Sequence, residues 1–228
     1  IGLSIAHELA RNGRNVEVLS RKRSEAAGFV AAGMLAPHAE GLQDSLLKLG
    51  QLSLLRIPNW VDKIQIDSGI NCGLQICGIV VPFLTEFERD SYATAEFGEK
   101  LNRSALEREV PGIASHWRSG LLFKQDGQID NRRQLMRALE KACVQLGVHF
   151  QEGVEVLDII QKSNHFRGVK LRNAKGELKT LHGEEGVICS GAWSSQIIKD
   201  LPIFPVKGQM LSLQGPKRAL KRIVFGPG

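Results

Sequence analysis

The sequence has 228 residues, of which 43% are hydrophobic and 24% charged, a composition typical of a globular protein with one or two domains. Its net charge is +6, but the basic residues are dispersed and aromatic residues do not interleave with them, so we expect no nucleic-acid partner. It has no run of eighteen apolar residues, so we also expect no membrane span.

The chain begins at Ile1 instead of a methionine and ends after the apolar run Ile223–Phe225, which predicts an internal piece of a longer protein. Its four cysteines form no C-x-x-C pair, so we expect no metal site. Cys143 and Cys189 lie in apolar patterns typical of buried free thiols, which predicts a reducing, cytoplasmic location.

The first twenty residues predict half of a dinucleotide-binding unit. Apolar residues recur at helical spacing over Gly2–Asn12, Gly13 is a helix-ending residue, and Asn15–Leu19 is typical of a strand. This order matches the second half of a βαβ unit, in which Gly2 would be the third glycine of a G-x-G-x-x-G fingerprint.

One feature departs from that pattern. The strand normally ends in an acidic residue that accepts the ribose hydroxyls, whereas this chain has Ser20 and then Arg21. Ser20 could hydrogen-bond a ribose hydroxyl and the basic run Arg21–Arg23 could meet phosphate. The alternative interpretation is a solvated loop.

Small residues dominate Ala31–Glu40, a segment suited to close approach of backbone to a flat ligand. Gly33 provides conformational freedom, and Met34 is a soft apolar side chain suited to packing on a ring system. Core packing is the alternative role for Met34. For His38 we expect a structural role, bonded to backbone, with a place near a substrate entrance as the alternative.

The remaining elements follow from periodicity and turn residues. The helices expected are two over 44–67, split by Pro58, one over 85–101, one capped by a box at 104–107, and one over 135–146. The segment 74–83, interrupted at Gly78, is expected to form two short strands or one bent strand. The other strands expected are 120–123, 128–130 after the turn Asp126-Gly127, 148–150, 154–160, 166–171, 178–181, and 186–189 leading into a helix.

Several segments resemble the FAD-dependent D-amino-acid oxidase superfamily and, within it, the glycine oxidases of thiamine biosynthesis. The resemblance covers essentially the whole chain. Its motifs are Ile1-Gly2-Leu3-Ser4-Ile5-Ala6, Ala31-Ala32-Gly33-Met34-Leu35, His38-Ala39-Glu40, Val156, Ser190-Gly191-Ala192-Trp193 and Pro205-Val206-Lys207-Gly208-Gln209-Met210-Leu211.

The resemblance implies an α/β fold, with a Rossmann-like FAD-binding domain and a second, mostly antiparallel α+β substrate domain. The FAD-binding domain is expected to comprise 1–70, without its first strand, and 130–201. The substrate domain is expected to comprise 71–129 and 202–228, where Pro205–Leu211 would open a strand.

The same resemblance implies a cofactor, FAD, and residues that hold it. These are expected to be Ile1, Gly2, Ser20, Arg21, Ala27, Gly28, Ala32, Gly33, Met34, Val156, Ser190 and Gly191. The catalytic residues would lie C-terminal to Gly228. The implied reaction converts glycine or a sarcosine-like amine to an imine and then a 2-oxo acid, with oxygen as acceptor and peroxide released, in a homo-oligomeric full-length protein.

Two other functions remain open at this stage. A related D-amino-acid or sarcosine dehydrogenase would pass electrons to an acceptor other than oxygen. A non-catalytic binding module would keep the fold without the cofactor, and Ser20 in the acidic position is the residue that favours it.

Overall fold

The computed structural model describes residues 1–129, 132–211 and 220–226. The chain forms two compact units, each built from separated segments. The first unit contains Ile1–Ala31, Asp67–Gly69 and Met136–Met210, and the second contains Ala32–Ile66, Ile70–Leu135 and Leu211–Gly228. These limits are not those of the predicted domains, and the domain boundaries stay a prediction.

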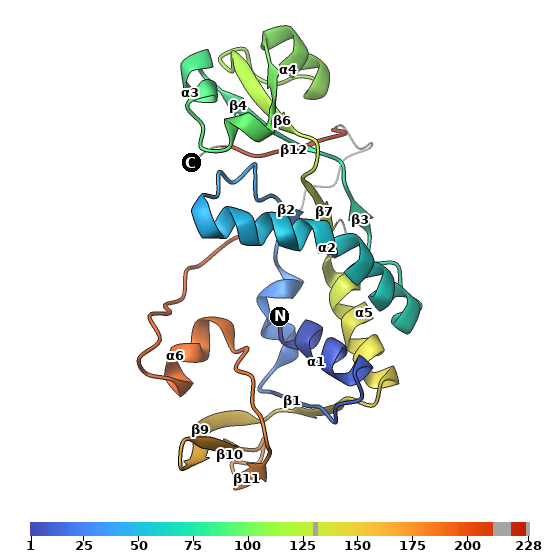
Figure 1. Cartoon of the computed structure of the whole chain (residues 1–228), viewed down its shortest axis with the longest axis vertical. Coiled ribbons are helices and arrows are strands. Elements are labelled where there is room, and N and C mark those ends of the chain that lie inside the picture. The colour runs from blue at the N-terminus through green and yellow to red at the C-terminus, as the bar shows by residue number, and fades with distance from the viewer. Residues whose placement is uncertain (130–131, 212–219, 227–228) are drawn as a thin grey trace. The chain divides into compact units, whose positions relative to one another are not determined.

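The first unit begins with helix α1 (Gly2–Arg11) and strand β1 (Glu17–Ser20), as the sequence predicts. β1 pairs in parallel with β8 (His149–Glu152). Figure 1 shows α1 beside β1. Ala6, Cys143 and Val148 form the buried centre of this layer, with Leu3, Ala10, Val16, Val18 and Phe150 packed around them. The apolar residues of α1, which recur at about 3.6-residue spacing, therefore face the sheet.

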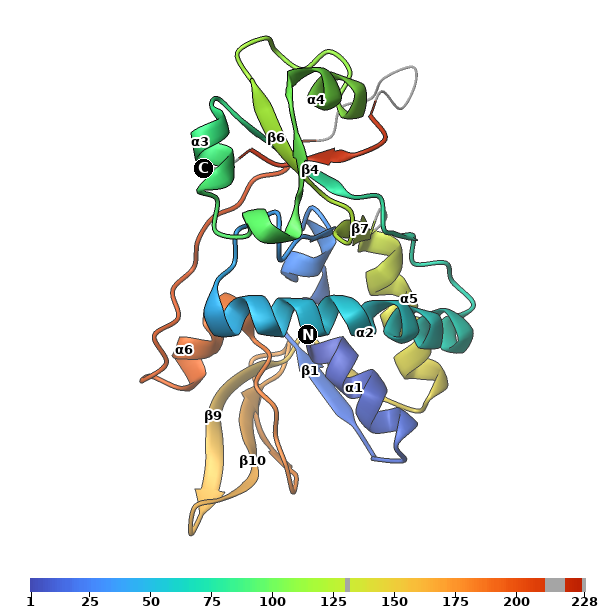
Figure 2. The same cartoon turned by 45° about the horizontal axis from the view of Figure 1, so that its top comes forward.

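A three-stranded antiparallel sheet follows in the same unit. Its strands are β9 (Glu155–Lys162), β10 (His165–Arg172) and β11 (Leu178–His182), in the order β11-β10-β9. This confirms the predicted meander, visible as the long strands of Figure 2. The strand expected over 186–189 is wrong, because no described strand pairs with it. A 3-10 turn (Gly191–Trp193) and the short helix α6 (Ser194–Ile197) follow.

Two small sheets form the second unit. Their strands are β2 (Met34–Leu35), β3 (Leu74–Gln75), β4 (Ile79–Phe83), β5 (Glu99–Leu101), β6 (Ser119–Phe123), β7 (Gly127–Ile129) and β12 (Ile223–Val224). One sheet has the order β12-β4-β6-β5, with β12 parallel to β4 and the other pairs antiparallel. The other sheet has the order β2-β7-β3 and is antiparallel. Of the two alternatives predicted for 74–83, the structure has the two short strands, β3 and β4, separated at Gly78, whose φ is +76°.

Fully buried side chains from the strands make the core of the second unit. They include Ile79, Val81, Leu121 and Phe123, which pack with Ala36 and Ala39. Helices α3 (Glu86–Asp90) and α4 (Arg103–Glu109) pack against the larger sheet (Figures 1 and 2). This alternation of buried strands and short helices is the α+β pattern expected for the second domain.

One helix, α2 (Asp44–Ser68), replaces the two predicted on either side of Pro58. Proline removes one backbone donor and usually ends a helix. Here Pro58 lies on the exposed side of α2, while Val61 and Ile64, one turn later, are buried. Burial of these side chains holds the second half of the helix in line, so the predicted break was wrong. Helix α5 (Arg132–Gln145) occupies the region predicted from 135 to 146.

Two further predictions were wrong. The helix expected over 85–101 ends at Asp90, and Glu99–Leu101 is instead strand β5, because it pairs with β6. The pairing overrides local helical preference. Residues 205–211, expected to open a strand, form neither a strand nor a helix. Asp130 lies outside the described residues. No helix in the described part of the chain is long and apolar enough to cross a membrane.

The capping box also lies at a different place from the one predicted. Thr85 Oγ1 accepts from the Glu88 amide at 3.1 Å, and Glu88 Oε2 accepts from the Thr85 amide at 3.0 Å, at the start of α3. Helix α4 is capped by Asn102, whose Oδ1 accepts from the Ala105 amide at 2.9 Å, so Ser104 lies inside the helix. Both caps use the short polar side chains that favour this position.

This assignment predicts the effects of two similar substitutions. Thr85→Ala should lower the free energy of unfolding by about 1 kcal/mol, because the Glu88 amide loses its side-chain acceptor. Ser104→Ala should change it by less than about 0.5 kcal/mol. Urea unfolding of both variants measures the difference, and a larger loss for Ser104→Ala would contradict the caps described here.

Candidate cofactor site

Helix α1 begins at Gly2, directly after the N-cap residue Ile1, whose apolar side chain accepts no hydrogen bond. The first turn of the helix contains no acidic residue, and the first bond within the helix runs from the Ile5 amide to the Ile1 carbonyl at 3.0 Å. Free amides at a helix start attract anions such as phosphate. A β-carbon on Gly2 would lie 3.2 Å from Cys189 Cβ, so this glycine permits close packing of the helix start against Cys189. The third fingerprint glycine allows a similar close packing against a strand, whereas Cys189 lies outside any strand here, so the fingerprint role of Gly2 stays a prediction.

The end of β1 is joined to two other predicted segments. The Ser20 carbonyl accepts from the Val154 amide at 3.1 Å, which places it beside the entry to β9. The Arg21 guanidinium carbon lies 5.4 Å from the centre of the Trp193 ring, a cation–π distance. The first unit therefore brings Ser20 and Arg21 together with the Ser190–Trp193 segment.

The basic run after β1 divides into two kinds of residue. Arg23 is bonded to Glu140 at 2.9 Å and to Glu152 at 2.8 Å, and its guanidinium carbon lies 4.7 Å from the centre of the Phe150 ring. It is therefore a structural cation. Arg21 is about half exposed and pairs at the surface with Glu25 at 3.2 Å, a weak interaction that a phosphate could replace.

The other predicted residues of this unit lie in three places. Ser190 Oγ and Ser194 Oγ are 3.0 Å apart, and Gly191 has φ +55° with open space around it. Val156 pairs with Leu171 in β9 and β10. Ala27 and Gly28 form a 3-10 turn in which a β-carbon on Gly28 would lie 2.6 Å from Met136 Sδ. Helix α6, which contains Ser194, contacts β9, the strand that contains Val156.

Ala32, Gly33 and Met34 belong to the second unit. Gly33 has φ +85°, and a β-carbon there would clash with the carbonyl oxygen of Ile129, whose amide donates to the Gly33 carbonyl at 2.8 Å. The pairing of β2 with β7 is therefore sufficient to require a glycine at position 33, whether or not this residue contacts a cofactor. Met34 is half-buried and packs against the core around Ile79, which supports its packing role. Contact of Gly33 or Met34 with a flavin stays a prediction.

His38 is bonded to a carboxylate, whereas we expected a backbone partner. Its Nδ1 donates to Asp126 Oδ1 at 2.6 Å, and Gln51 Nε2 lies 3.2 Å from its Nε2. Burial raises the pKa of the Asp126 carboxyl, although hydrogen bonds from His38 and the Ala39 amide act in the opposite direction. Sequence reasoning found Asp126 only as a turn residue, because nothing local indicates a partner 88 residues away.

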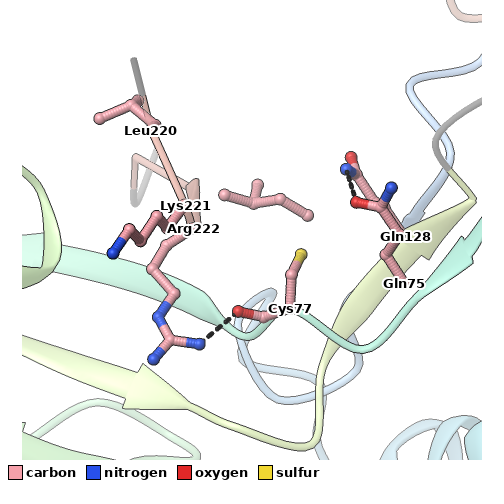
Figure 3. A pocket seen from close by; sticks show the side chains of 7 residues that line it. Gln75, Cys77, Gln128, Leu220, Lys221 and Arg222 are labelled. Atoms are coloured by element: carbon pink, nitrogen blue, oxygen red, sulfur yellow. Dashed lines mark hydrogen bonds between the residues drawn. The ribbon is translucent and has the colours of Figure 1, made fainter. Parts of the chain in front are cut away.

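Two hollows lie within the second unit. The larger, of about 390 Å³, has Gln75 and Gln128 on one side and Leu220, Lys221 and Arg222 on the other, with Cys77 between them (Figure 3). Arg222 is held by Glu109 at 2.8 Å and by the Cys77 carbonyl at 2.6 Å. The smaller, of about 200 Å³, is lined by Met34–Pro37, Glu40, Leu42 and residues of α2.

The fold and the glycine-bearing helix start together define a dinucleotide-type α/β protein. A model of the FAD-dependent oxidoreductase family (DAO) matches residues 1–227. The chain belongs to this family, whose cofactor is FAD. The predicted fold class, a Rossmann-like FAD-binding domain with a second, mostly antiparallel α+β domain, is confirmed.

Individual relatives agree with this assignment. The chain is 35% identical to the bifunctional protein ThiO/ThiG of Synechocystis, over 100% of this chain and 34% of the relative. It is 30% identical to the glycine oxidase of Geobacillus kaustophilus, over 99% of this chain and 62% of that protein. The crystal structure of the latter matches with a TM-score of 0.88 at 28% identity, over 99% of this chain and 63% of that chain. The chain thus spans between about a third and two thirds of these relatives.

The residues of the first unit suit FAD. The amides at the start of α1 are of the kind that bind a pyrophosphate, and Ser20 has a hydroxyl that could bond a ribose. The acidic residue usual at the position of Ser20 is absent, so the contact of Ser20 with a ribose stays a prediction.

Substitution of Ser20 tests this assignment. In the natural full-length protein, Ser20→Ala should raise the Kd for FAD about fivefold, since one neutral hydrogen bond contributes about 1 kcal/mol. Fluorescence titration of FAD measures the change. Ser45→Ala, an exposed serine on α2, is the control and should bind FAD like the parent. Equal Kd values for all three proteins would exclude Ser20 from the site.

Proposed function

We propose that the full-length protein is an FAD-dependent oxidase of glycine and of small primary or secondary amines such as sarcosine. It would form an imine that hydrolyses to a 2-oxo acid, and it would release hydrogen peroxide. The main support is the similarity in fold and sequence, over nearly the whole chain, to the glycine oxidase of Geobacillus kaustophilus. The ThiO/ThiG relative supports a role in thiamine thiazole synthesis.

This chain would contribute the binding of the cofactor. FAD, when bound, supplies the acceptor for the hydride from the substrate α-carbon. The start of α1 would hold the pyrophosphate, Ser20 a ribose hydroxyl, Arg21 phosphate, and the backbone at Val156 the adenine end. Ser190 and Gly191 would approach FAD through their backbone. Ala27 and Gly28, in the 3-10 turn that follows β1, would also contact the cofactor. Ala32–Met34 would face the ring system.

The chemistry requires little from this chain beyond orientation and exclusion of water, because the cofactor carries the difficult step. The groups that would clamp the substrate carboxylate are expected beyond Gly228. The four cysteines, Cys72, Cys77, Cys143 and Cys189, are free thiols. Cys143 is buried as predicted, whereas Cys189 is exposed, so its predicted burial was wrong. The free thiols support a reducing, cytoplasmic location. We further propose a homo-oligomer, as the family resemblance implies.

Purified natural full-length protein tests the proposal directly. It should be yellow with bound FAD, and it should consume oxygen and release one peroxide for each glycine oxidised. Oxygen-electrode and peroxide assays with glycine and sarcosine measure this activity.

The alternatives give different results in the same assays. A dehydrogenase would reduce an added dye with the same substrates without consuming oxygen. A non-catalytic module would be folded and colourless and would take up no FAD. Either outcome would contradict the proposed oxidase.

A further inference from the structure

A strand pair of only two residues carries the segment proposed to face the flavin. Met34 pairs with Gln128 and Leu35 with Gly127. So short a ladder provides few backbone hydrogen bonds and needs support at its ends. One end is closed by the bond from the Ile129 amide to the Gly33 carbonyl. The other end is next to Asp126, the residue before Gly127.

Asp126 closes that second end with both carboxylate oxygens. Oδ1 accepts from His38 Nδ1 at 2.6 Å, and Oδ2 accepts from the Ala39 amide at 2.9 Å. Its own carbonyl accepts from the Gly78 amide at 2.9 Å, which ties it to the start of β4. The Asp126 carboxylate therefore joins His38 and Ala39, which follow β2, to the turn that enters β7. We call these two hydrogen bonds the clasp.

The clasped residues are held from further sides as well. The Thr94 hydroxyl donates to the His38 carbonyl at 2.6 Å, and the Tyr92 hydroxyl donates to the Ala39 carbonyl at 2.7 Å. The His38 ring packs between Phe97 and Phe123, with centroid distances of 5.1 and 6.1 Å. The main chain at His38–Ala39 has little freedom to shift.

The hydrogen bonds of His38 and Asp126 are all satisfied by one arrangement of their protons. With Nδ1 of His38 donating to Asp126, the neutral ring offers Nε2 as an acceptor to the Gln51 amide, 3.2 Å away. Every polar atom of the pair then has a partner. Asp126 is fully buried and His38 is 3% exposed. A buried carboxylate is costly for stability alone, and such groups are often retained because they specify one arrangement.

We propose that Asp126 and His38 are positioning residues, which hold Gly33–Leu35 in the register that the bound flavin requires. This inference rests on the proposed function, because it assumes that the segment faces the flavin. Neither residue need touch the cofactor: each acts through the backbone of β2 and of the turn that follows it. Loss of the clasp should therefore change flavin binding as well as stability.

The test compares variants of the natural full-length protein by FAD titration and by the visible circular dichroism of the bound flavin. Asp126→Ala should raise the Kd for FAD about tenfold and alter the dichroism, a magnitude typical of residues that support a binding shell. Asp126→Asn should stay within about twofold of the parent, below the change expected of the alanine variants. Its amide oxygen accepts from the Ala39 amide and its NH2 donates to His38 Nδ1, once the imidazole tautomer reverses and the Gln51 amide turns its oxygen toward Nε2.

Ser119→Ala is the matched control. Ser119 is fully buried in the same unit, and its hydroxyl donates to the Thr85 carbonyl at 2.8 Å, away from β2. It should lower the Tm and leave both flavin readouts unchanged. If Asp126→Ala does not fold, His38→Ala decides, with an expected rise in Kd of about threefold.

Two results would overturn the inference. In one, Asp126→Ala and His38→Ala fold and have the Kd for FAD and the flavin dichroism of the parent, which leaves Asp126 a purely structural residue. In the other, Ser119→Ala changes the flavin readouts as much as they do. A parent protein that takes up no FAD contradicts the proposed function itself, and the inference with it, so the two failures are distinguishable.

Discussion

The second unit depends on the fully buried carboxylate of Asp126, whose two oxygens and carbonyl accept hydrogen bonds from His38, Ala39 and Gly78. These bonds join the chain after β2, the turn before β7 and the start of β4. The larger sheet is stabilised by apolar burial around Phe123, which tolerates small shifts of position. The small sheet has only two or three residues a strand, so directional hydrogen bonds must set its register.

A different constraint organises the first unit, where main chain must approach main chain and cofactor. Gly2 lets the start of α1 pack against Cys189, and no side chain caps that helix start. The cation–π contact of Arg21 with Trp193 then places the end of β1 beside the Ser190–Gly191 loop. Each unit thus presents its own share of the segments by which this chain resembles FAD-dependent oxidoreductases.

Local patterns in the sequence predicted the elements that local forces determine. The amphipathic spacing of α1 and the meander of β9–β11 are present. The turn predicted at Asp126-Gly127 lies two residues earlier, at Lys124-Gln125, because Gly127 already pairs in β7. The failures came from tertiary effects: burial of Val61 and Ile64 carries α2 through Pro58, and pairing with β6 makes residues 99–101 a strand. For the site, motifs indicated Gly2 and Gly33, but no pattern relates His38 to Asp126, since their contact exists only in the folded chain.

A crystal structure of the natural full-length protein with FAD tests the central claim most directly, namely that this chain holds the cofactor with the residues named. The account predicts the pyrophosphate at the amides that begin α1, the ribose within hydrogen-bonding distance of Ser20 Oγ, and the ring system beside Gly33 and Met34. A flavin bound elsewhere, with the start of α1 facing solvent, would contradict it.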